Sequence, residues 1–137
     1  MGRLLSIDFG MRRIGLAVTD PLKIIATGLD TVENKEIIPY LKGYFDREEV
    51  ERIILGLPVG LDDEDTDATA GVKVFRKKLE KNFPSIPIEY VDERYSSKMA
   101  FEAMIQGGLK KKKRRNKATI DKISAVVILQ EYLEHHT

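Results

Sequence analysis

The spacing of apolar residues changes along this chain of 137 residues, and that change restricts its fold more than any other feature. Three β-prone runs come first, at Arg3 to Phe9, Arg13 to Thr19 and Ile24 to Val32. Short turns separate them, so they predict an antiparallel meander. After the third run the period becomes helical, and helical and strand patterns then alternate. Such alternation predicts strands joined by helical crossovers.

Two more strands and four helices follow the meander. The run from Arg52 to Leu57 is almost wholly apolar and ends at Pro58, which predicts a strand buried on both faces. The other strand is Ile88 to Asp92. Helices are predicted from an N-cap at Asn34, along the stripe from Ala68 to Phe83, from a cap at Ser96 or Ser97 to Gly107, and from about Thr119 to His135. The last should be the most buried, because its centre is apolar on every side. The order βββαβαβαα predicts a mixed five-stranded α/β sheet with helices on both faces, in one domain of residues 1–137.

The composition narrows the class of protein. The chain has no cysteine, which excludes disulfide frameworks, zinc-thiolate sites and cysteine nucleophiles and fits a reducing compartment. The N-terminus lacks the apolar run of a signal peptide, and no stretch approaches the length that spans a membrane. We therefore expect a cytoplasmic protein without a membrane partner.

The net charge of +1 hides an uneven distribution. Seven of the eight positions from Lys110 to Lys117 are cationic, so the rest of the chain has an excess of acidic residues. A body rich in acids with one cationic segment suggests carboxylates gathered in one place and a polyanion bound in another.

Three acidic positions stand out because of their place in the predicted fold. Asp8 ends the first strand, Asp92-Glu93 ends the last strand, and Asp121 lies in the first turn of the final helix. The carboxyl ends of parallel strands meet at one sheet edge, where α/β proteins form ligand sites. Three clustered carboxylates repel one another unless a cation lies between them. Oxygen ligands without His or Cys suit Mg²⁺ or Mn²⁺, which can activate water for phosphodiester hydrolysis.

Each acid also has a plainer explanation. Asp121 can complement a helix dipole, and Asp92 or Glu93 can be a solvated strand end. Asp8 is harder to explain in this way, because a carboxylate that follows an apolar run on a central strand needs a partner.

Four segments, in this order, resemble the motif series of the YqgF family, whose members are also called RuvX-like. They are Asp8 to Ala17, Gly56 to Pro58, Asp92 to Ser97, and Ile120 to Ala125. Members of the family are described as Holliday junction resolvases and as nucleases of ribosomal RNA precursors. The resemblance spans nearly the whole chain and keeps the motif order.

The resemblance implies a ribonuclease H-like fold with a divalent-metal nuclease site. It places the first acid at Asp8, the second within Asp92-Glu93 and the third at Asp121. We prefer Glu93 as the second ligand, although alternation along the strand does not decide the choice. The implied substrate is structured nucleic acid, either the 5′ end of a ribosomal RNA precursor or a branched DNA junction, and the sequence leaves both open.

Several glycines and basic residues could contact phosphates, and each also has a structural explanation. A hairpin glycine usually serves the turn, an arginine after a strand can form a surface ion pair, and the basic run can be a solvated loop. The candidate nucleic-acid contacts are Gly10, Arg13, Arg94, Lys110, Lys111, Lys112, Lys113, Arg114, Arg115, Lys117 and Lys122.

Two other classes of function compete with the nuclease. A non-catalytic RNA-binding or assembly module would keep the fold, but all three acidic positions are occupied here. A nucleotide binder of the actin and sugar-kinase type is suggested by Asp8-Phe9-Gly10, but the chain has length for only one such domain. A resolvase needs two sites, so a two-fold dimer would favour that role, whereas an RNA-end nuclease can act alone. We expect a monomer or a weak homodimer.

Overall fold

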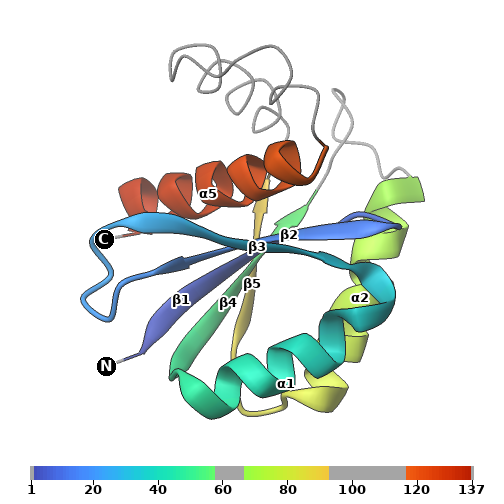
Figure 1. The fold of residues 1–137 in the computed structure, drawn as a ribbon, viewed down its shortest axis with the longest axis horizontal. Coiled ribbons are helices and arrows are strands. Elements are labelled where there is room, and N and C mark those ends of the chain that lie inside the picture. The colour runs from blue at the N-terminus through green and yellow to red at the C-terminus, as the bar shows by residue number, and fades with distance from the viewer. Residues whose placement is uncertain (1, 58–66, 93–116, 137) are drawn as a thin grey trace.

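A computed structural model of the protein describes residues 2–57, 67–92 and 117–136 (Figure 1). Its elements are, in chain order, β1 (Arg3–Asp8), β2 (Arg13–Thr19), β3 (Ala26–Glu33), the 3-10 helix η1 (Asn34–Glu36), α1 (Ile37–Arg47), β4 (Val50–Leu57), α2 (Asp67–Asn82), β5 (Ile88–Asp92) and α5 (Lys117–His136). The helix predicted from Ser96 or Ser97 to Gly107 lies outside the described residues.

The strands form one mixed sheet in the order β3-β2-β1-β4-β5. Neighbours in the meander β1-β2-β3 are antiparallel, while β4 pairs in parallel with both β1 and β5. The predicted meander and the mixed five-stranded sheet are therefore confirmed, and β1 is the central strand.

Helices cover both faces of the sheet, as predicted: α1 and α2 lie on one side and α5 on the other (Figure 1). The core under α1 and α2 includes Leu55 of β4, and the core under α5 includes its neighbour Ile54, both without exposed surface. Successive residues of a strand point to opposite faces. The apolar run in β4 therefore serves two cores, which confirms that this strand is buried on both sides.

The first helix begins differently from the prediction. Asn34 does not cap it, because η1 precedes α1 and no side-chain cap bond is present at either start. The Asn34 amide instead donates from Nδ2 to the carbonyl of Gly10 at 2.8 Å. Pro39 lies in the first turn of α1, where its missing N–H removes no helical hydrogen bond.

The third strand also begins later than predicted. Ile24 and Ile25 are exposed in the turn before β3, at 67% and 63% of their full surface. The carboxylate of Asp20 accepts hydrogen bonds from the backbone N–H groups of Leu22, Ile24 and Ile25, which hold this turn together. These local bonds replace the pairing that a longer strand would have made.

The last helix packs through one side on the sheet. Ala125, Ile128 and Leu129 are buried, whereas Val126 and Val127 keep part of their surface exposed. The apolar centre of α5 is therefore less enclosed than its composition suggested. In the described part of the chain, no helix has both the length and the apolar character needed to cross a membrane.

Candidate functional site

Asp8 is the last residue of the central strand and is partly buried. Leu4 belongs to the core under α5, and Ser6 donates a hydrogen bond from Oγ to the carbonyl of Ala125 at 2.6 Å. Ile7 belongs to the opposite core. Because every second residue of a strand shares a face, Asp8 lies on the face that α5 covers.

The three parallel strands end at the same edge of the sheet. Ile7 of β1 is in register with Leu55 of β4, and Leu57 of β4 is in register with Asp92 of β5. Asp8 and Asp92 thus occupy the carboxyl ends of β1 and β5, the two parallel strands on either side of β4, and lie at one edge of the sheet as the sequence predicted. We call this side of the sheet the carboxyl edge.

The residues of β5 alternate between the two cores. Ile88 packs under α1 and α2, and Val91 packs against the core under α5. Glu89 shares the side of Val91, because its carboxylate pairs with Arg52 at 2.5 Å and Arg52 also donates to the hydroxyl of Tyr132 on α5. Odd-numbered positions of the described strand therefore face α5.

The final helix runs in the opposite direction to β1. Ala125 lies over Ser6, whereas Tyr132, two turns later, reaches Arg52, which pairs in the sheet with Leu4. Moving forward along α5 is therefore moving backward along β1. The first turns of α5 approach the carboxyl edge, as Figure 1 also shows.

Two of the three predicted metal ligands have a described backbone. Asp8 ends β1, and Asp121 lies in α5 one helical turn before Ala125. Glu93 and the side chain of Asp121 lie outside the description, and the described side chains include no group of three acidic or histidine residues that could hold a metal. The metal site therefore stays a prediction, and carboxylate oxygens such as that of Asp8 are donors of the type that Mg²⁺ and Mn²⁺ prefer.

The described candidates for nucleic-acid contact differ in position. A side chain at Gly10 would bring Cβ within 2.4 Å of the Arg13 carbonyl, so the hairpin itself requires this glycine. Lys122 lies over Gly28 of the edge strand β3, since its Cγ is 2.8 Å from where a Cβ would stand. Its stem is thus two strands away from Asp8. Arg13 is the first residue of β2, is partly buried and is in register with Glu33 of β3. The remaining candidates lie outside the description, as does the side chain of Lys117: Arg94, Lys110, Lys111, Lys112, Lys113, Arg114 and Arg115.

Charged groups at the opposite edge of the sheet pair with one another. Lys23 contacts Glu51, and its hydrogen bond lowers the pKa of that carboxyl. Burial, followed by the nearby carboxylate of Glu89, raises the pKa of Tyr132. These interactions tie β4, β5 and α5 together far from Asp8, and we assign them a structural role.

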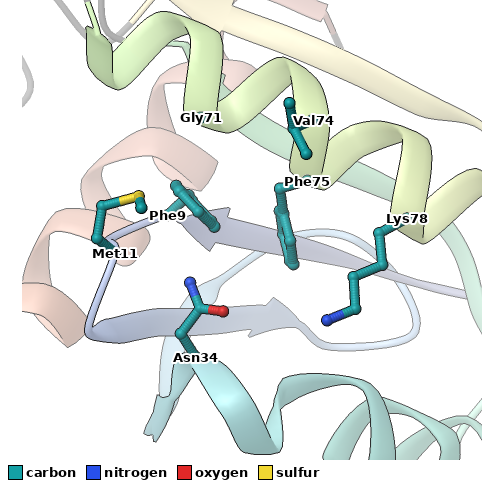
Figure 2. A pocket seen from close by; sticks show the side chains of 7 residues that line it. All are labelled: Phe9, Met11, Asn34, Gly71, Val74, Phe75 and Lys78. Atoms are coloured by element: carbon teal, nitrogen blue, oxygen red, sulfur yellow. The ribbon is translucent and has the colours of Figure 1, made fainter.

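A cavity of about 370 Å³, which the sequence analysis did not predict, lies between the β1–β2 hairpin and α2. Phe75 belongs to the stripe that predicted α2, and Phe9 directly follows Asp8. The side chains converge on the cavity from the hairpin, from η1 and from one side of α2 (Figure 2). Its lining residues are Phe9, Met11, Asn34, Gly71, Val74, Phe75 and Lys78. A sequence signal that could have indicated this opening is Gly71, a glycine within the helical pattern of α2.

Comparison with known families and relatives gives a consistent result. Residues 2–135 match the family model described as "RuvX: Holliday junction resolvase". A relative from Christiangramia forsetii is 51% identical over 133 residues, which cover 97% of this chain and 98% of the relative. Another from Porphyromonas gingivalis is 50% identical over 135 residues, which cover 98% of each. The activity attributed to both relatives is that of a pre-16S rRNA nuclease.

Solved structures with the same fold include two resolvases bound to Holliday junctions. The RuvC protein of T. thermophilus has a TM-score of 0.60 and 17% identity, with 100% of this chain and 98% of that one covered. The Fowlpox virus resolvase has a TM-score of 0.60 and 12% identity, with 97% of each chain covered. At these identities the likeness concerns the fold, and it confirms the ribonuclease H-like sheet expected from the sequence.

Proposed function

The chain belongs to the RuvX family of Holliday junction resolvases, and from this membership we propose that it is a nuclease that hydrolyses phosphodiester bonds in structured nucleic acid. One observation carries the proposal. The chain is about 50% identical, over nearly its whole length, to relatives that are described as nucleases. The position of Asp8 on the central strand, at an edge where three parallel strands end, supports a reaction centre there.

We propose that Asp8, Glu93 and Asp121 hold one or two Mg²⁺ or Mn²⁺ ions. The direction of α5 supports this set, because Asp121 precedes Ala125 by four residues and residues so spaced share a helix face. We prefer Glu93 to Asp92 because Glu89 and Val91, at odd-numbered positions of β5, face α5, and a residue two positions beyond Val91 would share that face if the strand period continued.

A bound ion would supply an activated water and would stabilise the leaving oxygen of the phosphodiester. The chain's own part is to hold the carboxylates in a fixed arrangement. The bond from Ser6 to Ala125 ties the central strand to the final helix two residues before Asp8 and one helical turn after Asp121, so it positions Asp8 relative to Asp121.

Of the two candidate substrates, we propose the precursor of 16S ribosomal RNA. The relatives with about 50% identity are attributed that substrate, while the junction-bound resolvases share 17% identity or less. A branched DNA junction is the second candidate, because the family description names it. We propose action in the cytoplasm as a monomer or weak homodimer, and a stable two-fold dimer would favour the junction.

We propose that the basic segment from Lys110 to Lys117 binds phosphates that flank the cleaved bond, because it leads directly into the helix that bears Asp121. Changing four of its cations to serine should weaken binding of all sequences about equally and reduce the dependence of affinity on salt. Titrations of a labelled RNA at several salt concentrations measure both. Unchanged affinity and salt slope would identify the segment as a solvated loop.

A cleavage assay on matched substrates tests the proposed function. A pre-16S rRNA fragment, a single-stranded RNA and a four-way DNA junction are incubated with the protein and Mg²⁺ or Mn²⁺. Asp8→Asn keeps the shape of the side chain but removes its charge, so cleavage should fall at least about a hundredfold. Asp46→Asn, on the exposed side of α1, is the matched control and should cleave normally.

Full activity of Asp8→Asn would contradict the proposed site. Binding that does not respond to Mg²⁺, with cleavage of none of the three substrates, would favour the non-catalytic RNA-binding module. Tight ATP binding in a calorimetric titration would favour the nucleotide binder.

A further inference from the structure

The cavity beside the β1–β2 hairpin has a lining that suits one nucleobase. We propose that it receives an unpaired base of the same strand that is cleaved near Asp8. This inference rests on the proposed nuclease function and adds a site for recognising the substrate. At about 370 Å³ the cavity falls within the range of small-ligand pockets, and its walls are mainly apolar, with Asn34 and Lys78 as the polar lining residues.

The apolar part of the lining offers surfaces for stacking. The rings of Phe9 and Phe75 lie 4.7 Å apart between centroids, with an angle of 33° between their planes. Phe75 is nearly buried, so the pair forms a fixed wall. Met11 and Val74 are 79% and 68% exposed, which leaves an apolar rim open to solvent. Each base has a flat face that stacks on such groups whatever its identity.

The polar part of the lining matches a nucleotide better than a purely apolar ligand. The bond from Asn34 Nδ2 to the carbonyl of Gly10 fixes the orientation of the amide, so Oδ1 is its acceptor. Figure 2 shows this amide and the amine of Lys78 at the same side of the cavity. An N–H group of a base can donate to Oδ1, while the cation of Lys78 suits a neighbouring phosphate.

Gly71 keeps the cavity open on the side of α2. A Cβ at this position would touch the Phe9 ring at 3.4 Å and the Met11 sulfur at 3.5 Å, which are ordinary contacts. Nothing in the backbone therefore requires glycine, and glycine inside a helix is less favourable than alanine. A larger side chain here would point at the same two residues that we propose for stacking, and would fill part of the space.

The position of the cavity relative to Asp8 identifies which base it would bind. Phe9 follows Asp8 directly, but Asp8 lies on the α5 face and Phe9 packs with the core under α1 and α2. A strand whose phosphate lies at Asp8 would therefore cross the carboxyl edge to bring a neighbouring base into the cavity. The proposed occupant is a base within a few nucleotides of the cleaved bond.

A scan with abasic nucleotides tests this proposal. A labelled pre-16S rRNA fragment is prepared as a series, each member lacking one base along the strand, and its Kd for the full chain is measured without divalent metal. For the wild-type protein, loss of one base should weaken binding about 5- to 150-fold, the range for base–aromatic stacking. Loss of the other bases should change Kd much less.

Two variants should remove this dependence on one base. Gly71→Leu fills the cavity, and Val74→Glu places an anion at its exposed rim. Both variants should bind the intact fragment with about the Kd that the wild type shows for the fragment lacking the recognised base. Removing that base should then change the Kd of neither variant. Thermal melting checks that each variant is folded.

Matched controls separate blocking of the cavity from general effects. Gly43→Leu makes the same substitution in α1, where a Cβ would meet nothing within 4 Å. Ile24→Glu makes the same charge change at a residue 67% exposed, close to the 68% of Val74, but outside the cavity. Both controls should keep the wild-type scan.

The result that overturns the proposal is a flat scan for the wild type, or a scan that Gly71→Leu and Val74→Glu leave unchanged. Equal weakening of every fragment by both variants would also overturn it, because the cavity would then bind something other than a base. These outcomes leave metal-dependent cleavage and its loss in Asp8→Asn untouched, so the nuclease proposal stands or fails separately.

Discussion

The face of the sheet under α1 and α2 is lined by aliphatic and aromatic side chains, whereas the face under α5 mixes them with hydroxyl and charged groups. Leu5 and Ile7 of β1 pack on the first face without exposed surface. On the second face the same strand presents Leu4, Ser6 and Asp8, and Ser6 bonds to the helix above it. One strand therefore contributes apolar packing to one side and polar contacts to the other.

The two faces therefore have different roles, one in stabilising the fold and the other in positioning α5. The core under α1 and α2 is larger and draws on all five strands and both of these helices. Among the described elements, α5 is the helix that closes the other face, over a smaller core. Apolar burial is not directional, but hydrogen bonds set position and orientation. We infer that the first face supplies most of the stability and that the second sets where α5 begins.

The largest expected effect compares two neighbouring residues of β4. Leu55→Ala should lower the free energy of unfolding by about 3–5 kcal/mol and Ile54→Ala by about 2–4 kcal/mol. The second value is smaller because α5 can shift toward the space that the lost methyl groups leave. Urea denaturation measures both. The comparison of the two faces fails if Ile54→Ala is the more destabilising change.

A second effect compares two hydroxyl groups on the α5 face. Thr19 Oγ1 accepts a hydrogen bond from the Leu4 N–H at 2.9 Å, at the end of the sheet away from Asp8. Thr19→Val should lower the free energy of unfolding by about 1–3 kcal/mol, because it leaves the buried N–H group of Leu4 without its acceptor. Ser6→Ala should lower the free energy of unfolding by only about 1 kcal/mol. The Ala125 carbonyl loses the Ser6 hydroxyl as a donor, but it lies within α5, where backbone N–H groups donate to carbonyls.

Cleavage should respond in the opposite order. Ser6→Ala loosens α5 one turn from Asp121, so cleavage of the RNA fragment should fall severalfold, while Thr19→Val should cleave at the wild-type rate below its melting temperature. Initial rates at saturating substrate and at low substrate separate binding from turnover. Equal rates for the two variants would show that the Ser6 bond does not position the site.

A third, smaller effect concerns the ion pair under the far end of α5. Arg52 and Glu89 keep 37% and 39% of their side chains exposed, so solvent screens their attraction. Arg52→Met retains most of the apolar stem and should change the free energy of unfolding by less than about 1 kcal/mol. A loss comparable to that of Ile54→Ala would mean that charge pairing, and not the small apolar core, holds α5 in place.

The smallest effect lies in the turn beside the end of α5. Backbone hydrogen bonds, that of Ile25 first, lower the pKa of Asp20 below its ordinary value of 3.8. The ionised Asp20 carboxylate therefore stabilises the fold at pH values above 3.8, and this stabilisation is lost as the pH falls through the lowered pKa of Asp20 in the folded protein. Asp20→Asn should flatten the fall in melting temperature below about pH 4. An unchanged acid limb would show that other carboxyls dominate there.

The sequence predicted the elements whose hydrophobic pattern is strong. The bounds of β2 and β5 agree with the structure, and the apolar run of β4 predicted a strand buried on both faces. The weaker predictions failed where local hydrogen bonds compete with a regular element. Asn34 bonds across the chain to Gly10 and does not cap a helix, and Ile24 lies in a turn held by Asp20.

The carboxyl edge could be expected from the order of elements, but the cavity beside it could not. Asp8 follows a strand in a chain whose later crossovers are parallel, which places it at that edge. Phe9 and Phe75 are far apart in the sequence and each has an ordinary role in a strand end or a helical stripe. Their contact depends on how α2 lies against the hairpin, which no local pattern encodes.

By itself the sequence determined which residues of a strand share a face of the sheet, because the period of two in a strand follows from backbone geometry. Once these segments are strands, that period places Asp8 on the same face as Ser6, and Leu55 on the face opposite Ile54. Which helix covers each face was decided only by the tertiary structure, because both faces of β4 are apolar and either could accept α5. The contacts of α5 with Ser6 and Ile54 settled that choice, and with it the face on which Asp8 lies.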